Sequence, residues 1–339
     1  MMKRIGHIVD RITLDDLRRE AAKIASSNPC RRRQAERFLA RFDELGPRLL
    51  QAIKTCTWQP SALRARDIFE HGKLRHIEVP TSTDTLVQRV LCYPQLERVF
   101  TNHTWPHSYS SIKGRGPLKA AKHVARLVRT RQAKWCCYFD VRKYYAHINR
   151  DILKADLRRM IKDETALTLL GRIVDMGEQG VAIGNTVSHF LANIYLTPVI
   201  HALAERGAIS DAVVYMDNVF LFGGSKRKLH QARLDAVRLL AERGLEMKAD
   251  WQIFRTDLRA VKIGGYRIQA GRPWRIYRAT FNHLRRALRQ FKRNHSLHAA
   301  RALASLKGWV TTAGCRSFYN NHINNTWPNA RKVIQHAHA

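Results

Sequence analysis

The chain has 339 residues, of which 45% are hydrophobic, so it can form a folded core in two or three lobes and is not a disordered chain. Lys and Arg number 60 against 27 Asp and Glu, which gives a formal net charge of +33 at pH 7. Such an excess is self-repulsive unless a polyanion is the usual partner, and nucleic acid is the first candidate. An anionic membrane fits less well because the basic residues are spread along the whole chain. A solvated basic surface without a partner is the third reading.

The cysteines and the amino terminus bear on the cellular compartment. The six cysteines show no C-x-x-C pair and no spacing of metal ligands, which favours free thiols in a reducing compartment. Cys136 and Cys137 are adjacent, so in a strand they would point to opposite faces. No apolar run near the start resembles a signal peptide, and none elsewhere reaches transmembrane length. We therefore predict a cytoplasmic protein with no membrane partner.

Residues 10–58 have the apolar periodicity of helices. Thr13 is placed to cap a first helix that has two aspartates in its first turn. A second helix is expected after Pro29, because apolar residues recur at helical spacing from Phe38 to Leu49. The chain is therefore expected to begin with a helical segment.

A hairpin, an interrupted helix and a basic loop are expected next. Residues 66–80 alternate around His71–Gly72, which predicts a β-hairpin. Residues 86–100 indicate a helix that is interrupted near Pro94. Residues 108–128 indicate a basic, glycine-containing loop that leads into a helix.

Two strongly apolar segments carry an acidic residue at the end of a strand. WCCYFDVRKYYAHI (residues 135–148) reads as a central strand covered on both faces, ending on Asp140. VVYMDNVFLF (residues 213–222) reads as a hairpin with Asp217–Asn218 at its turn. A buried hairpin with an incidentally acidic tip is the alternative for the second segment.

The remaining elements are expected as helices at 151–174, 188–203 and 226–243, a loop at 178–185, and strands at 245–248 and 262–268. After Asp257 the chain has no carboxylate side chain. An apolar stripe from Phe281 to Phe291 is surrounded there by Arg and Lys. This pattern predicts a basic helical lobe from about residue 275 that packs on a core and faces phosphate.

Asp140 and Asp217 together have the pattern of a two-metal site. Transfer of a nucleotidyl group needs two divalent ions, one at the attacking hydroxyl and one at the leaving phosphates. Carboxylate ligands suit Mg²⁺, which also binds the phosphates of the substrate. Either aspartate alone is equally typical of a turn or a cap, so only their placement at two strand ends is informative.

The order of these segments resembles that of a reverse transcriptase over nearly the whole chain. YFDVRKYYAHI resembles the first catalytic motif of that family, GVAIGNTVSHFLANIYL its template- and nucleotide-positioning helix, and YMDN its Tyr-x-Asp-Asp hairpin. GLEMK and IGGYRI resemble the two strands that follow, and GKLRHIEVP with SYSSIKGRG resemble the finger motifs. Within the family, IGNTVSH is most similar to the enzymes of diversity-generating retroelements, which are related to the reverse transcriptases of group II introns.

The resemblance implies roles at the catalytic centre. Asp140 and Asp217 would bind two Mg²⁺ ions, which Mn²⁺ can replace, with the backbone carbonyl of Val141 as a third ligand. Asn218 stands at the second Asp of the hairpin and would offer a neutral oxygen. Lys248 falls where a lysine protonates the leaving pyrophosphate; a surface-strand lysine is the alternative.

The resemblance also implies nucleotide contacts. Lys73 and Arg75 would grip the incoming triphosphate, unless they belong to an ordinary solvated strand edge. Tyr145 would lie under the sugar and exclude a 2′-hydroxyl, and a core aromatic is the alternative. Ile183, followed by Gly184 and Asn185, replaces a glutamine that contacts the nucleotide in most of the family. Loss of that polar group implies errors at template adenines; packing at the base of the loop is the alternative.

Three positions depart from the pattern. Asn218 replaces an aspartate, His189 replaces the Gln of the retroelement signature, and DTLVQ (residues 84–88) lacks the usual Arg. The subgroup therefore rests on fewer residues than the enzyme class.

The resemblance implies an α+β, right-hand polymerase fold with fingers, an antiparallel-sheet palm and a helical thumb. Residues 1–135 would form mainly fingers, 136–274 the palm with a fingers insertion at about 150–185, and 275–339 the basic thumb. The implied function is copying of a retroelement template RNA into cDNA from deoxynucleoside triphosphates, with a small basic accessory protein as a further partner. The alternatives are a group II intron, retron or phage-defence reverse transcriptase, or a non-catalytic RNA-binding protein whose site has decayed.

Overall fold

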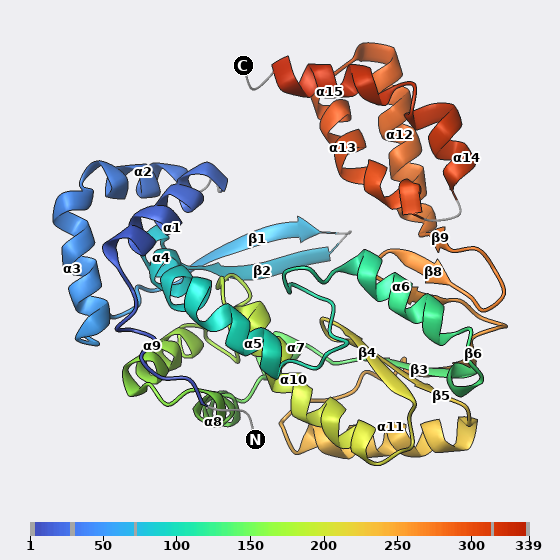
Figure 1. Cartoon of the computed structure of the whole chain (residues 1–339), viewed down its shortest axis with the longest axis horizontal. Coiled ribbons are helices and arrows are strands. Elements are labelled where there is room, and N and C mark those ends of the chain that lie inside the picture. Colours follow the sequence, from blue (N-terminus) through green and yellow to red (C-terminus); the bar gives the residue numbers. More distant parts are fainter. Residues whose placement is uncertain (1–3, 28–30, 71–72, 313–314, 337–339) are drawn as a thin grey trace.

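The computed structural model describes residues 4–27, 31–70, 73–312 and 315–336 (Figure 1). Its helices are α1 (Leu14–Ser27), α2 (Arg32–Ala40), α3 (Phe42–Lys54), α4 (Ser82–Leu91), α5 (Glu97–His103), α6 (Pro117–Leu127), α7 (Tyr144–His147), α8 (Arg150–Met160), α9 (Glu164–Val174), α10 (Ser188–Glu205), α11 (Lys226–Ala241), α12 (Arg278–Asn294), α13 (Leu297–Thr312), α14 (Arg316–Phe318) and α15 (Trp327–His336). Its strands are β1 (Arg64–Glu70), β2 (Lys73–Val79), β3 (Trp135–Asp140), β4 (Asp211–Tyr215), β5 (Asn218–Gly223), β6 (Gln252–Arg255), β7 (Val261–Ile263), β8 (Tyr266–Ile268) and β9 (Arg275–Ile276).

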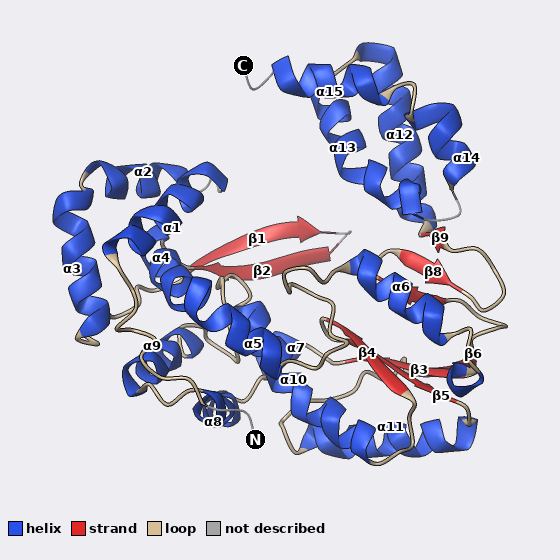
Figure 2. Cartoon of the chain, in the orientation of Figure 1, coloured by secondary structure: helices blue, strands red, loops and turns tan. Residues whose placement is uncertain are grey.

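The central sheet has four strands in the order β4-β5-β3-β6, and all its neighbours are antiparallel. Helix α11 lies on one face and α6 on the other (Figure 2). Cys137 and Phe139 of β3 belong to the core on the α11 side, whereas Cys136 belongs to the core that α6 shares with the C-terminal helices. The predicted central strand with its two cysteines on opposite faces is therefore confirmed, as is the α+β class with antiparallel sheets.

The N-terminal helices agree with the sequence pattern except at one break. The hydroxyl of Thr13 accepts from the backbone N–H of Asp16 at 3.2 Å, so the predicted cap is confirmed. The prediction of a single second helix is wrong. This segment forms two separate helices, α2 and α3, and the break between them lies at Arg41, where φ is −114° and ψ is 30°. The apolar spacing nevertheless continues across the break. The rings of Phe38 and Phe42, on either side of it, pack edge to face with their centroids 5.8 Å apart.

The hairpin β1–β2 and the interrupted helix are confirmed. Arg64 pairs with Val79 and Glu70 with Lys73, and the expected turn at His71–Gly72 lies outside the described residues. Between α4 and α5, Tyr93 has φ −111° and ψ 117°. The residue before a proline is driven out of the helical region, so Pro94 explains the interruption. The predicted helix at 151–174 is two helices, α8 and α9, and Asp163 caps the second.

Two predicted strands take different forms. Residues 245–248 make only an isolated antiparallel bridge, between Val141 and Met247, and not a strand. Residues 262–268 are not one strand but the hairpin β7–β8, which turns at Gly264–Gly265 with φ of +50° and +88°. Two consecutive glycines favour such a turn because a side chain disfavours positive φ.

The C-terminal lobe α12–α15 is helical, as predicted, and stands apart from the central sheet beyond β7–β9 (Figure 1). Leu284, Leu288 and Phe291 of α12 are buried, whereas the neighbouring Arg285 and Arg289 are exposed. Trp309 of α13 packs on the glycine turn, where a Cβ on Gly265 would lie 2.5 Å from the indole ring. Among the helices that the structure describes, none combines the length and apolarity needed to span a bilayer.

The contact between Gly265 and Trp309 gives a paired test. In Gly265→Ala the new side chain sits on a residue with positive φ and its Cβ also contacts the indole of Trp309. In Gly271→Ala the residue has a positive φ of +71°, but its Cβ has no atom within 4 Å. We expect Gly271→Ala to cost about 1 kcal/mol of unfolding free energy and Gly265→Ala to cost about 1–3 kcal/mol more. Urea unfolding followed by tryptophan fluorescence measures both, and equal losses would show that the indole yields without cost.

Candidate active site

The sheet brings Asp140 and Asp217 to the same edge. Asp140 ends β3 and pairs with Asn218, the first residue of β5. The backbone N–H of Val141 donates to the backbone carbonyl of Asp217 at 3.1 Å, which fixes the two chain segments side by side. The turn consists of Met216 and Asp217, one residue earlier than the predicted Asp217–Asn218 turn. Met216 has φ +59°, a backbone conformation that is uncommon for residues other than glycine, asparagine and aspartate.

Lys248 is held against Asp140 by the bridge at Met247. Its backbone N–H donates to the carbonyl of Asp140 at 2.9 Å, and its Nζ lies 2.7 Å from Asp140 Oδ1. The buried Oδ1 of Asp140 therefore already has a cationic neighbour, the ammonium of Lys248.

The donor set at this edge fits a hard divalent cation. Two carboxylates, with the backbone carbonyl of the buried Val141 beside them, supply the oxygen ligands that such ions take. The ammonium of Lys248 already lies against Asp140 Oδ1, so a divalent cation would share this oxygen with Lys248 or displace it.

Asn218 is bonded on both sides of its amide. Tyr138 donates its hydroxyl to Asn218 Oδ1 at 2.7 Å, and Asn218 Nδ2 donates to Asp217 Oδ1 at 2.9 Å. Burial, followed by the charges of nearby aspartates, raises the pKa of Tyr138 to about 12, so this hydroxyl keeps its proton. A cleft opens beside the pair, lined by further aromatic side chains and by Arg259 and Lys262. Tyr138 was not singled out from sequence, where it reads as one more apolar strand residue.

Tyr145 lies next to the carboxylates. Burial and the charge of Asp217 raise the pKa of Tyr145 to about 12. Its ring meets that of Tyr144 edge to face at 5.8 Å, and Tyr144 is fully buried, donating its hydroxyl to the carbonyl of Ala192 at 2.5 Å. The paired aromatics therefore differ: Tyr144 anchors the segment, and Tyr145 is the half-buried partner.

Contacts of Gly184 and Asn185 hold the segment Ile183–Asn185 in place. A Cβ on Gly184 would lie 1.9 Å from the backbone oxygen of Glu78, so only glycine permits this approach to β2. Asn185 is buried and accepts from Gln88 Nε2 at 2.9 Å, while Gln88 Oε1 accepts from the N–H of Thr186 at 2.7 Å. Ile183 is 49% exposed.

Gln88 was missed by the sequence reasoning, although it is the buried polar residue that holds this loop to α4. The sequence contains a signal for this role, because Gln88 is a polar residue inside a helix with apolar neighbours. His189, which follows the same loop, has a pKa lowered by burial to about 4, so its ring is neutral at pH 7. It stacks at a tilt on Phe190, with ring centroids 4.1 Å apart.

Lys73 and Arg75 lie on β2, opposite Glu70 and Ile68. Their side chains lie outside the part of the chain that the structure describes. Both residues belong to β2, the strand whose backbone Gly184 approaches closely. The β1–β2 hairpin and the loop that carries Ile183 are therefore in contact.

Comparisons with known proteins place part of the chain in one family and show similarity to other proteins, of which two follow. Residues 64–268 match the family profile described as "Reverse transcriptase (RNA-dependent DNA polymerase)". Protein YkfC of Escherichia coli (strain K12) is 27% identical over 44% of this chain and 42% of its own length, so the match spans less than half of that relative. A solved structure of apo telomerase from Candida Tropicalis covers 62% of this chain and 47% of that chain, with a TM-score of 0.49 and 12% identity.

Asn218→Asp tests the charge at this edge. The change replaces the donor to Asp217 by a second carboxylate, and the added repulsion is relieved only when a cation binds. We expect the affinity of the nucleic-acid-free protein for Mn²⁺ to rise about 10-fold, measured by titration calorimetry. Tyr138→Phe is the control: it removes the other hydrogen bond of Asn218 without adding charge and should give no gain. Unchanged affinity in Asn218→Asp would place residue 218 away from the cation.

Proposed function

The chain belongs to the reverse transcriptase family, and on that premise we propose that it is an RNA-directed DNA polymerase that copies a template RNA into cDNA. The observation that carries the proposal is the junction of Asp140 and Asp217 at one sheet edge, with the ammonium of Lys248 beside Asp140. The right-hand polymerase arrangement suits it, with fingers from residues 1–135 and about 150–185, a palm from 136–274 and a thumb from 275 onward.

In this proposal Asp140, Asp217 and the carbonyl of Val141 hold two Mg²⁺ ions, for which Mn²⁺ can substitute. Bound there, the ions would activate the attacking hydroxyl and hold the leaving phosphates. Asn218 orients the carboxylate of Asp217 through its amide N–H and is itself held by Tyr138. Lys248 keeps its ammonium beside Asp140, within the site, from where it can donate a proton to the leaving pyrophosphate.

The nucleotide would be held from the other side. Lys73 and Arg75 on β2 would contact its triphosphate, and Tyr145 would lie under its sugar and favour deoxynucleotides. Ile183, Gly184 and Asn185 would face the nascent pair; of these only Ile183 exposes a large apolar side chain. The excess of basic residues supports a nucleic acid partner.

The central experiment is template-dependent cDNA synthesis by the purified full chain with Mg²⁺ or Mn²⁺. Asp140→Asn keeps the size of the side chain but removes its charge, so we expect at least a 1000-fold loss of incorporation, about 4 kcal/mol of transition-state stabilisation. Asp257→Asn, which loses an exposed carboxylate paired with Arg255, should keep full activity. Equal output from wild type and Asp140→Asn would favour the alternative, a non-catalytic RNA-binding protein whose site has decayed at Asn218.

The proposed subgroup is the reverse transcriptases of diversity-generating retroelements, with a small basic accessory protein as partner. Its support is the sequence IGNTVSH together with the exposure of Ile183. A group II intron, retron or phage-defence enzyme is the alternative within the family. In this reading Ile183 gives the nascent pair no hydrogen bond, so wrong pairs at template adenines are poorly rejected.

Ile183→Gln tests that reading. A hydrogen bond worth about 1.4 kcal/mol in the transition state should lower the error rate at template adenines about 10-fold, measured by sequencing cDNA made on one defined RNA. Leu234→Gln changes an equally exposed aliphatic residue on α11 and should leave the errors unchanged. Errors spread evenly over the four template bases in wild type would argue for another branch of the family.

A further inference from the structure

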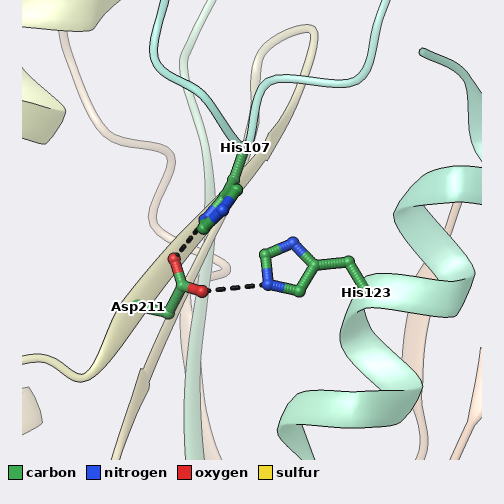
Figure 3. A group of neighbouring side chains, drawn as sticks. All are labelled: His107, His123 and Asp211. Carbon is green, nitrogen blue, oxygen red and sulfur yellow. Dashed lines mark hydrogen bonds and ion pairs between the residues drawn. The ribbon is translucent and has the colours of Figure 1, made fainter. Parts of the chain in front are cut away.

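A second cluster of polar side chains lies at the far end of β4 from the catalytic turn. It joins His107, in the loop before α6, His123 on α6 and Asp211, the first residue of β4 (Figure 3). His107 Nδ1 lies 2.6 Å from Asp211 Oδ1, and His123 Nε2 lies 3.0 Å from Asp211 Oδ2. One ligand atom from each residue can be chosen so that all lie within 4.8 Å of one another.

The surroundings of His123 are those of a metal ligand. Its other ring nitrogen, Nδ1, lies 2.6 Å from the hydroxyl oxygen of Tyr109, and both residues are buried. Histidines that bind metals commonly bind through one nitrogen and donate the other N–H to an oxygen, which fixes the ring. Tyr109 supplies that oxygen and leaves Nε2 directed at the shared position.

We propose that His107, His123 and Asp211 form a zinc site. Two imidazoles and one carboxylate are a typical protein ligand set for Zn²⁺, whereas Mg²⁺ prefers oxygen alone. The fourth position is taken by water on the side of His107, whose side chain is 37% exposed. Ligand atoms around tetrahedral zinc stand about 3.3 Å apart, so binding opens the present 2.6 and 3.0 Å contacts by about 0.7 and 0.3 Å and closes any pair that lies farther apart, up to 4.8 Å.

The site has a structural consequence for β4. The loop already pairs with this strand, because the N–H of Val214 donates to the carbonyl of His107 at 3.0 Å and the N–H of Tyr109 donates to that of Val214 at 2.9 Å. A zinc ion adds α6 to this junction. It thereby fastens two segments, the loop and α6, to the strand that leads into Met216 and Asp217, and it acts as a positioning site with no contact to the reacting groups.

The alternative is a metal-free clamp. Burial, which alone would raise the pKa of Asp211, is outweighed by the hydrogen bonds from His107 and His123, which bring it to about 2. A charged carboxylate between two imidazoles is stable without an ion. The metal content of the protein separates the two readings.

The test uses the full chain, purified without a polyhistidine tag, exposed to low micromolar free zinc, dialysed, and analysed for metal by mass spectrometry. Wild type should hold one zinc per chain, and its melting temperature should rise by about 5 °C on zinc loading. His107→Ala and Asp211→Asn should hold none and lose the shift, while circular dichroism checks that they fold. His298→Ala, which removes an exposed histidine on α13, should keep both.

Tyr109→Phe adds a readout that a simple clamp does not predict. Losing the oxygen that orients His123 should weaken zinc binding about 10-fold without changing its stoichiometry. Cobalt-loaded wild type should show the visible absorption of a tetrahedral site. Wild type that retains no zinc, or His107→Ala that retains as much as wild type, would overturn the proposal in favour of the clamp. None of these readouts depends on polymerase activity, so they stand apart from the proposed function.

Discussion

The pairing of β3 with β5 is the constraint on which the candidate active site depends. Each strand is anchored by side chains buried on both faces of the sheet, so a slip by one residue would move every one of them into the opposite core and disrupt the packing of both. That register sets Asp140 opposite Asn218 and leaves Asp217 in the turn beside it. The site is therefore a consequence of how the core packs, and its acidic groups require no further segment to bring them together.

Like charges at this edge are balanced by the chain itself. Lys248 lies against Asp140, and Asn218 gives Asp217 an N–H where a second aspartate would give repulsion. Each of these neighbours is held by a separate contact, the bridge at Met247 and the hydroxyl of Tyr138. These contacts hold the side chains at this edge in place, which is the preorganisation that a polar site needs.

Much of this arrangement could be predicted from the sequence, because hydrophobic periodicity and turn residues are properties of short stretches of the chain. The β3 strand, the β1–β2 hairpin, the cap at Thr13 and the basic terminal lobe are of this kind. The break at Arg41 has no marked signal in the sequence, and the form of residues 245–248 depends on Val141, a partner distant in the chain. The contacts of Gln88, Tyr138 and the His107–His123–Asp211 cluster were missed for the same reason.

The C-terminal lobe contains no acidic side chain, since Asp257 is the last carboxylate residue before it. Its helices pack on a shared apolar core, and its positive side chains have no acidic side chains of their own within the lobe. A bound phosphate backbone would supply the negative charge that they lack. If the proposed nucleic-acid partner binds this lobe, its binding would also stabilise the folded lobe, so ligand occupancy and folding stability would be linked.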